Sequence, residues 1–178
     1  MEATELLDRT GEALAAGRSR RYSGFMGKFI SALPLITSSY ILLYVGDFFD
    51  YLGLHLYGAH RALVYAFALI LVFLLVPAGK KAPLDRLPWY DALLAAAGAI
   101  SSLYIFFNWE QVTLFYGQPT LLILVLGGIT LLTTLEAARR TVGSAVAILG
   151  AIFIFYVLFG NYFPGFLFTR GYSYARMI

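Results

Sequence analysis

The sequence predicts an all-α integral membrane protein with about five transmembrane helices. Of its 178 residues, 60% are hydrophobic and 13% are charged, which is about half the charged fraction of a soluble domain. Two uncharged runs, residues 111–135 and 141–169, are each longer than the roughly 20 residues that one bilayer crossing requires. The short charged segment between them therefore marks a return of the chain to the membrane surface.

The distribution of basic residues predicts an N-terminus inside the cell and a C-terminus outside. Arginine and lysine in the loops of membrane proteins are biased to the cytoplasmic side. The loops assigned to the inside hold most of the 13 basic residues: Arg9, Arg18, Arg20, Arg21, Lys28, Lys80, Lys81, Arg86, Arg139 and Arg140. The segments assigned to the outside hold only Arg61, Arg170 and Arg176.

Residues 1–28 form a polar segment that we expect in the cytoplasm, either as a solvated tail or as a short helix lying on the membrane. The first span covers residues 29–46, and we expect Pro34 to kink it. The second span covers residues 62–76 and ends at Pro77, which cannot continue a helix without disrupting it.

Three further spans, residues 92–107, 121–135 and 142–159, complete a five-helix membrane domain over residues 29–159. The first of these three follows the tetrapeptide Pro88-Trp89-Tyr90-Asp91. Proline suits the first turn of a helix, an acid there complements the helix dipole, and the two aromatic rings suit the headgroup level. This tetrapeptide therefore predicts a helix start at the membrane surface.

The chain closes with an aromatic outer segment, residues 160–178. Pro164-Gly165 favours a turn, and the surrounding aromatic side chains suit the headgroup region. Two interpretations remain open: a turn at the membrane surface, and a linker leading into a further membrane domain. Because no polar tail follows, we expect a once-fused subunit or part of a longer protein.

Small residues indicate where helices pack closely, since apolar side chains alone give helices little reason to associate in lipid. The third span is rich in them: Ala92, Ala95, Ala96, Gly98, Ala99, Ser101 and Ser102. The fifth span carries Gly143, Ala147 and Ala151 at a spacing of four, which places them on one helix face. Packing within the chain and docking on a larger partner subunit both explain this face.

The sequence contains little that indicates catalysis, and we predict a protein that is not an enzyme and has no cofactor or metal site. Without cysteine, thiol chemistry and disulfides are excluded. The five-residue spacing of His55 and His60, with Asp47 or Asp50 nearby, matches no familiar metal site. No serine has a histidine at comparable depth for hydrolysis. The net charge of +3 is spread over membrane-flanking loops and does not indicate nucleic acid.

The charged segment 135–143 holds the most informative candidates. Glu136 can pair with Arg139 or Arg140 at helical spacing. An exposed pair contributes tenths of a kcal/mol, whereas breaking a pair buried against another subunit costs several. We weigh a structural hairpin and a partner contact equally. The full set of structural or partner-contact candidates is Glu136, Arg139, Arg140, Gly143, Ala147, Arg61, Asp91, Pro164 and Gly165.

Five stretches of this sequence together resemble a known family. They are Arg61-Ala62-Leu63, Pro77 with Lys80-Lys81, Pro88-Trp89-Tyr90-Asp91, the segment 135–143, and Tyr162-Phe163-Pro164-Gly165 with Arg170-Gly171-Tyr172-Ser173. In this order and spacing they are similar to the N-terminal part of the fused permeases of tripartite ATP-independent periplasmic (TRAP) transporters, in the branch with TAXI-type binding proteins. The likeness covers residues 61–176, about two-thirds of the chain.

This resemblance implies a small, Q-type membrane subunit or domain that scaffolds a sodium-coupled secondary transporter of organic anions. The implied partners are a large TRAP permease subunit or domain, which would hold the sodium, a periplasmic TAXI-type binding protein, and the lipid bilayer. The implied location is the bacterial or archaeal inner membrane, as a multi-pass protein. Two other hypotheses stay open: a self-sufficient small transporter or channel, and a membrane-embedded enzyme that depends on His55 and His60.

Overall fold

The structure is a computed structural model that describes residues 19–20, 22–53, 58–79, 82–114 and 119–177. The secondary structure of these residues is helical throughout, as the sequence predicts. Four helical stretches are long and apolar enough to cross a membrane: Gly27–Val45, Trp89–Phe107, Leu121–Thr141 and Ser144–Tyr162. The helix Ala59–Leu75 is apolar but has only 17 residues, so five spans and their orientation stay predictions.

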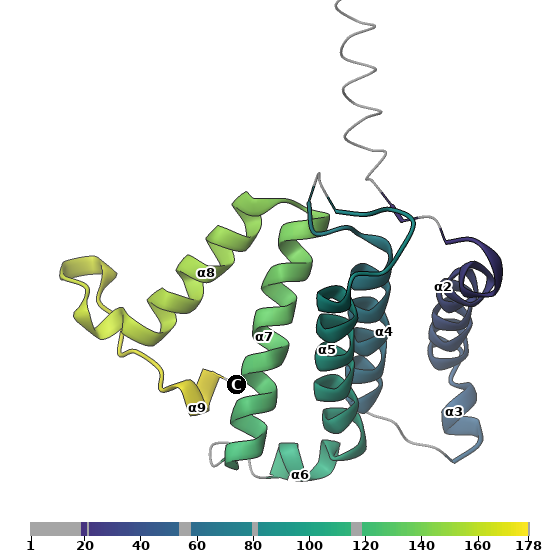
Figure 1. The fold of residues 1–178 in the computed structure, drawn as a ribbon. Helices are drawn as coiled ribbons and strands as arrows, with labels where there is room; N and C mark the ends of the chain where they lie inside the picture. The colour runs from purple at the N-terminus through teal and green to yellow at the C-terminus, as the bar shows by residue number, and fades with distance from the viewer. Residues whose placement is uncertain (1–18, 21, 54–57, 80–81, 115–118, 178) are drawn as a thin grey trace, which may run out of the picture.

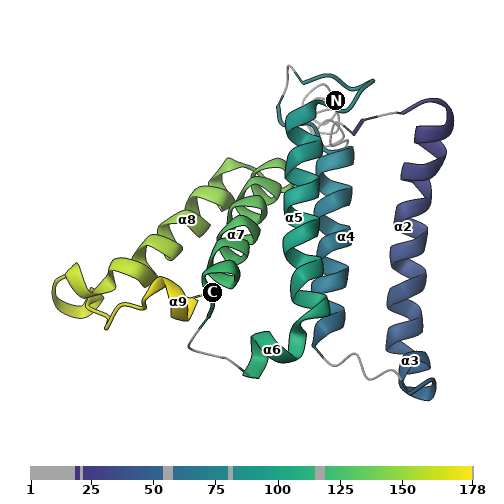
Figure 2. The ribbon, with the colours of Figure 1, turned by 60° about the horizontal axis from the view of Figure 1, so that its bottom comes forward.

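The longer helices run alternately up and down (Figure 1). In chain order the described helices are α2 (Gly24–Val45), α3 (Phe48–Tyr51), α4 (Ala59–Leu75), α5 (Trp89–Phe107), α6 (Trp109–Leu114), α7 (Leu121–Thr141) and α8 (Ser144–Phe159). Helices α4, α5 and α7 pack together, α2 stands beside α4, and α8 leans away from α7 (Figure 1 and Figure 2). Two 3-10 turns, η1 (Gly160–Tyr162) and η2 (Gly165–Leu167), and the short helix α9 (Tyr174–Met177) complete the chain. The short helices α3 and α6 were not expected from the sequence.

The core lies where α4, α5 and α7 meet, and small residues of α5 create it. Asp91, Ala95, Gly98, Ala99, Ser101 and Ser102 of α5 are buried. A methyl group added at Gly98 would lie 2.8 Å from a Leu69 methyl carbon, so even the smallest side chain there would require Leu69 of α4 to move. The buried side chains of Leu69 and Phe73 fill the space that these small residues leave. Close packing within the chain therefore explains five of the seven small residues named for this span, while Ala92 and Ala96 are exposed.

Helices α7 and α8 reverse direction at Val142 and Gly143, directly after the charged segment. Gly143 has a φ of +121°, a conformation that residues with a Cβ rarely adopt. Figure 2 shows α8 leaning away from the bundle on the far side of α7. Gly150 of α8 faces Leu135 of α7, at 3.1 Å from its ideal Cβ position. The chain reversal that the sequence predicts is thus present, although α7 continues as a helix through Arg140 before the turn.

The C-terminal segment folds back toward α7 and α8. The Tyr174 hydroxyl donates a hydrogen bond to the Leu124 carbonyl of α7 at 2.9 Å. The Tyr172 backbone N–H donates to the Val157 carbonyl at 2.8 Å. Gly165 begins its 3-10 turn with a φ of +64°, in agreement with the turn expected at Pro164-Gly165. The C-terminal segment is therefore held against its own chain by these two contacts.

Candidate functional site

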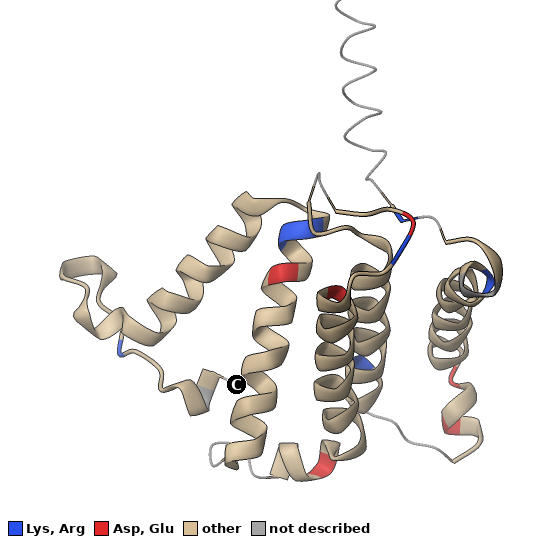
Figure 3. Cartoon of the chain, in the orientation of Figure 1, with Lys and Arg blue, Asp and Glu red and all other residues tan. Residues whose placement is uncertain are grey.

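Five charged residues gather at the end of the bundle where α4 and α7 finish and α5 begins. We call this the charged end, and the charge cluster consists of Arg20, Asp91, Glu136, Arg139 and Arg140. Figure 3 shows that the charged residues of the described chain lie toward the ends of the helices. Because the middle turns of these helices carry no charged side chains, ionic contacts form at the helix ends.

Asp91 is at the centre of the cluster. It occupies the first turn of α5, where a negative charge interacts favourably with the helix dipole. One carboxylate oxygen accepts a hydrogen bond from the Arg20 guanidinium. The other oxygen lies 2.7 Å from an Arg140 nitrogen, an ion pair whose angle is poor for a hydrogen bond. Since all three side chains are at most 1% exposed, the carboxylate is shared by two arginines away from water.

Glu136 forms the second acidic centre and links the two arginines of α7. Both of its carboxylate oxygens accept hydrogen bonds from Arg139, each at 2.7 Å. Arg140 donates to one of the same oxygens, also at 2.7 Å. Arg140 therefore bridges Glu136 and Asp91, while its guanidinium stacks over the buried Phe73 ring at 4.9 Å. The side chains of Glu136 and Arg139 are 25% and 39% exposed, so this half of the cluster meets solvent.

Arginines of the charge cluster, first of all Arg20, also cap the C-terminal end of α4. The last carbonyls of a helix have no partner within it, and positive charge is favourable there. Arg20 donates through its side chain to the Phe73 and Leu74 carbonyls at 2.8 and 3.3 Å. Its backbone N–H donates to the Leu75 carbonyl at 2.8 Å. Arg20, in the segment before α2, thus supplies hydrogen-bond donors to the last carbonyls of α4 as well as to Asp91.

Further donors complete this cap. The Tyr22 hydroxyl donates to the Leu74 carbonyl at 2.7 Å; burial raises the pKa of Tyr22, although the nearby Arg20 charge opposes this, so the hydroxyl keeps its proton. Arg140 donates to the Val76 carbonyl and Arg139 to the Ala78 carbonyl, at 3.3 and 3.0 Å. The cluster therefore joins four parts of the chain: the segment before α2, the end of α4, the start of α5 and the end of α7.

The sequence identified four members of the cluster but not its burial. Glu136, Arg139, Arg140 and Asp91 were candidates, and the structure brings them together. The two alternatives weighed for the charged segment 135–143, a structural hairpin and a contact with another subunit, both stay predictions, and neither included what is observed: the Arg140 side chain is buried inside its own chain. Burial follows because Asp91 and the α4 carbonyls supply partners that the linear sequence does not reveal.

Arg20 is the member that sequence reasoning missed. Arg20 belongs to a group of basic residues that we interpreted as a signal of membrane orientation, and nothing in its spacing distinguishes it from the other members of that group. The one available signal was Asp91, because an acid near the membrane in the first turn of a helix calls for a basic partner. A search for that partner would have had ten basic residues on the same side to choose from.

The other candidate residues lie away from the cluster. Arg61 is at the opposite end of α4, Gly143 is at the α7–α8 turn, and Ala147 is half-buried on α8. Pro164 and Gly165 are exposed in the C-terminal segment. His60 stacks on the Tyr44 ring with 3.6 Å between centroids, and His55 lies outside the described residues. The structure thus divides the nine candidates between one cluster and several separate places.

Four helices of the described chain are long and apolar enough to cross a membrane, which indicates a multi-pass helical membrane protein. Comparison with protein-family models, curated proteins and solved structures finds no match for the chain.

Proposed function

We propose that this chain is the small scaffold subunit or domain of a TRAP-type transporter, a membrane part that supports a larger permease and does not itself carry substrate. The sodium and the organic anion would be bound by that permease, and a periplasmic TAXI-type protein would deliver the anion. The sequence resemblance in residues 61–176 supplies the family. The geometry of the charge cluster supports the role.

The observation that carries this proposal is how the buried charges are used. Arg20, Asp91 and Arg140 bind one another and the carbonyls of α4. Ion pathways through membranes usually place ionisable groups within the span, facing water or the substrate. Here the groups instead hold four parts of the chain together at the helix ends. Such an arrangement stiffens the helix bundle. It also occupies these three side chains, so they are not free to bind and release an ion or a substrate.

The apolar surface is the second support. None of the residues of α8 is buried, and side chains such as Ile152 and Phe153 are more than half exposed. In a bilayer this surface is compatible with lipid, and its small residues at Gly143 and Ala147 also allow another helix to approach. A scaffold needs a face of this kind for its partner.

Reconstitution tests the proposal. The purified chain in liposomes is expected to give no sodium-driven uptake and no saturable sodium binding by calorimetry, whereas it co-purifies with a larger permease when the two are co-expressed. Sodium flux or saturable sodium binding by the chain alone would refute it and favour a self-sufficient transporter. A long hydrophobic permease encoded directly after this chain would identify the partner to co-express.

Membrane orientation has its own test, because the chain contains no cysteine. Single cysteines can replace the exposed residues Asp85, in the loop predicted inside, and Tyr172, in the segment predicted outside. A membrane-impermeant maleimide should label Tyr172→Cys in intact cells and Asp85→Cys only after permeabilisation. The opposite pattern would reverse the predicted topology.

A further inference from the structure

A groove of about 400 Å³ separates α2 from α4 at the end of the bundle opposite the charge cluster. One wall is formed by Tyr40, Ile41 and Tyr44 of α2, and the other by His60, Val64 and Ala68 of α4. Figure 2 shows α2 standing apart from the closely packed pair α4 and α5. In a membrane such a groove between two helices opens to lipid.

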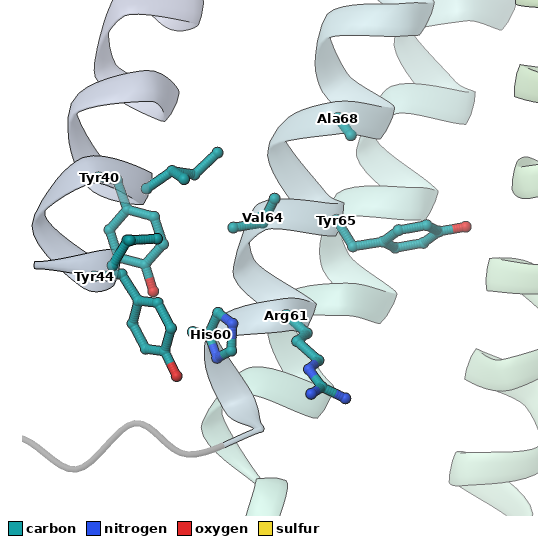
Figure 4. Close-up of a pocket in the computed structure, with 9 residues that line it drawn as sticks. Tyr40, Tyr44, His60, Arg61, Val64, Tyr65 and Ala68 are labelled. Atoms are coloured by element: carbon teal, nitrogen blue, oxygen red, sulfur yellow. The ribbon is translucent and has the colours of Figure 1, made fainter. Parts of the chain in front are cut away.

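The chemistry of the groove changes along its length. The portion beside Ile41, Val64 and Ala68 is lined by hydrocarbon. Figure 4 shows the hydroxyl groups of Tyr40 and Tyr44 and the ring of His60 directed toward the end where α4 begins. Arg61 lies at the rim of that same end. The groove is therefore apolar at one end and polar and basic at the other, in the direction of a lipid from tail to headgroup.

Two of its polar groups lack a partner in the described part of the chain. The Tyr40 hydroxyl oxygen is buried and makes no hydrogen bond there, and an unsatisfied buried hydroxyl is unfavourable. The exposed Arg61 guanidinium makes no ion pair with any described carboxylate. A cation is thus accessible at the polar end of the groove, and the buried Tyr40 hydroxyl beside it needs only a small shift of the ring to reach an acceptor there.

The nature of the groove argues against water as its occupant. Ordered water needs two to four polar partners, which the wall beside Val64 and Ala68 does not provide. Hydrocarbon fits this wall, a carbonyl oxygen would accept the Tyr40 hydrogen, and arginine matches a phosphate with two parallel hydrogen bonds. A ligand that carries hydrocarbon, then a carbonyl oxygen and then a phosphate would match the groove along its whole length.

We infer that the groove between α2 and α4 binds a glycerophospholipid from the leaflet that faces the start of α4. An acyl chain lies against Ile41, Val64 and Ala68, the Tyr40 hydroxyl donates to an ester carbonyl, and the phosphate pairs with Arg61. The lipid then fills the contact between the first span and the rest of the bundle. This inference requires a membrane-embedded chain and does not depend on the transporter proposal.

Native mass spectrometry of the full chain in a mild detergent tests the inference directly. The probes are phosphatidylglycerol and a diacylglycerol with the same acyl chains, which lacks the phosphate. The wild-type chain is expected to retain one phosphatidylglycerol and to bind the diacylglycerol at least tenfold more weakly. Equal binding of the two probes, or no retained phospholipid, would overturn the inference.

Variants locate the site. Val64→Trp fills the groove and should abolish retention, while Leu42→Trp places the same ring on an exposed part of α2 and should leave it unchanged. Arg61→Gln should weaken binding roughly 10- to 100-fold, the loss expected for a charged hydrogen bond. Equal retention by the two tryptophan variants would place the lipid elsewhere and contradict the inference.

Tyr40→Phe removes a single oxygen and keeps the ring, so it remains informative if Val64→Trp does not fold. It should weaken phosphatidylglycerol binding roughly 2- to 10-fold, as the loss of one neutral hydrogen bond does. Unchanged affinity would show that the hydroxyl does not reach the lipid. A dimer mass that Val64→Trp abolishes would instead assign the groove to a second copy of the chain and would likewise overturn the inference.

Discussion

Replacing Asp91 with asparagine should strongly destabilise the helix bundle. The change keeps the shape of the side chain and removes its charge. Arg20 and Arg140 then face each other at a site where all three side chains are at most 1% exposed. Removing one partner of a buried ion pair costs about 3–5 kcal/mol, which lowers the ratio of folded to unfolded chain about 10²- to 10⁴-fold.

Two features of the structure place the effect toward the lower part of this range. Arg140 keeps Glu136 as a partner at 2.7 Å, and Arg20 keeps the carbonyls of Phe73 and Leu74. Glu136 is already shared with Arg139, and the carbonyls carry no net charge, so these contacts neutralise only part of the charge that Asp91 balances. We therefore expect a loss of about 3 kcal/mol, measured by equilibrium unfolding in mixed micelles with circular dichroism.

A matched control separates burial from charge. Asp85 is exposed in the loop that precedes α5, and Asp85→Asn should change the free energy of unfolding by less than about 0.5 kcal/mol. Equal stability of the two asparagine variants would refute the reasoning. A double-mutant cycle with Arg20→Met adds a second check: if the pair interacts, the combined loss is smaller than the sum of the two single losses.

Three further predictions use the same unfolding measurement. Arg140→Met should cost several kcal/mol because it strips a buried carboxylate of its partner, whereas Arg139→Met, at a half-exposed position, should cost less than about 1 kcal/mol; similar losses for the two would contradict the difference in burial. Gly143→Ala should cost about 1–3 kcal/mol from backbone strain alone, since no atom lies within 4 Å of the added methyl group. Its control is Gly79→Ala, which is equally uncrowded but has no positive φ. This control should leave the free energy of unfolding nearly unchanged. Gly98→Ala should cost about 1–3 kcal/mol through overpacking against α4, and an unchanged midpoint would show that the core can yield.

Helix positions could be predicted from the sequence because lipid imposes a simple length rule. Uncharged runs located α5, α7 and α8 to within a few residues at most ends, and the charged segment located the reversal between α7 and α8. The end of α7 was placed too early, since Glu136, Arg139 and Arg140 were treated as a loop. They are helical because their charges find partners on one face of the helix.

The arrangement of the charge cluster could not be predicted for a different reason. Helical spacing reveals the pairing of Glu136 with Arg139 and Arg140, which lie three and four residues away. Asp91 lies 71 residues from Arg20, in the segment before α2, and 49 residues from Arg140, on α7, and no periodicity encodes these contacts. Such contacts form only when the fold brings α5 beside α7 and beside the segment before α2.

The position of the cluster along the helices reconciles stable pairing with a membrane environment. A charge at the centre of the bilayer is costly, and the cost falls toward the headgroups. At the helix ends, Asp91 at the start of α5 and the arginines at the ends of α4 and α7 also match the helix dipoles. The chain thus obtains long-range connections among four segments where buried charges are least unfavourable. Because the charge cluster lies at the helix ends, α8 and the α2–α4 groove remain available to other membrane components.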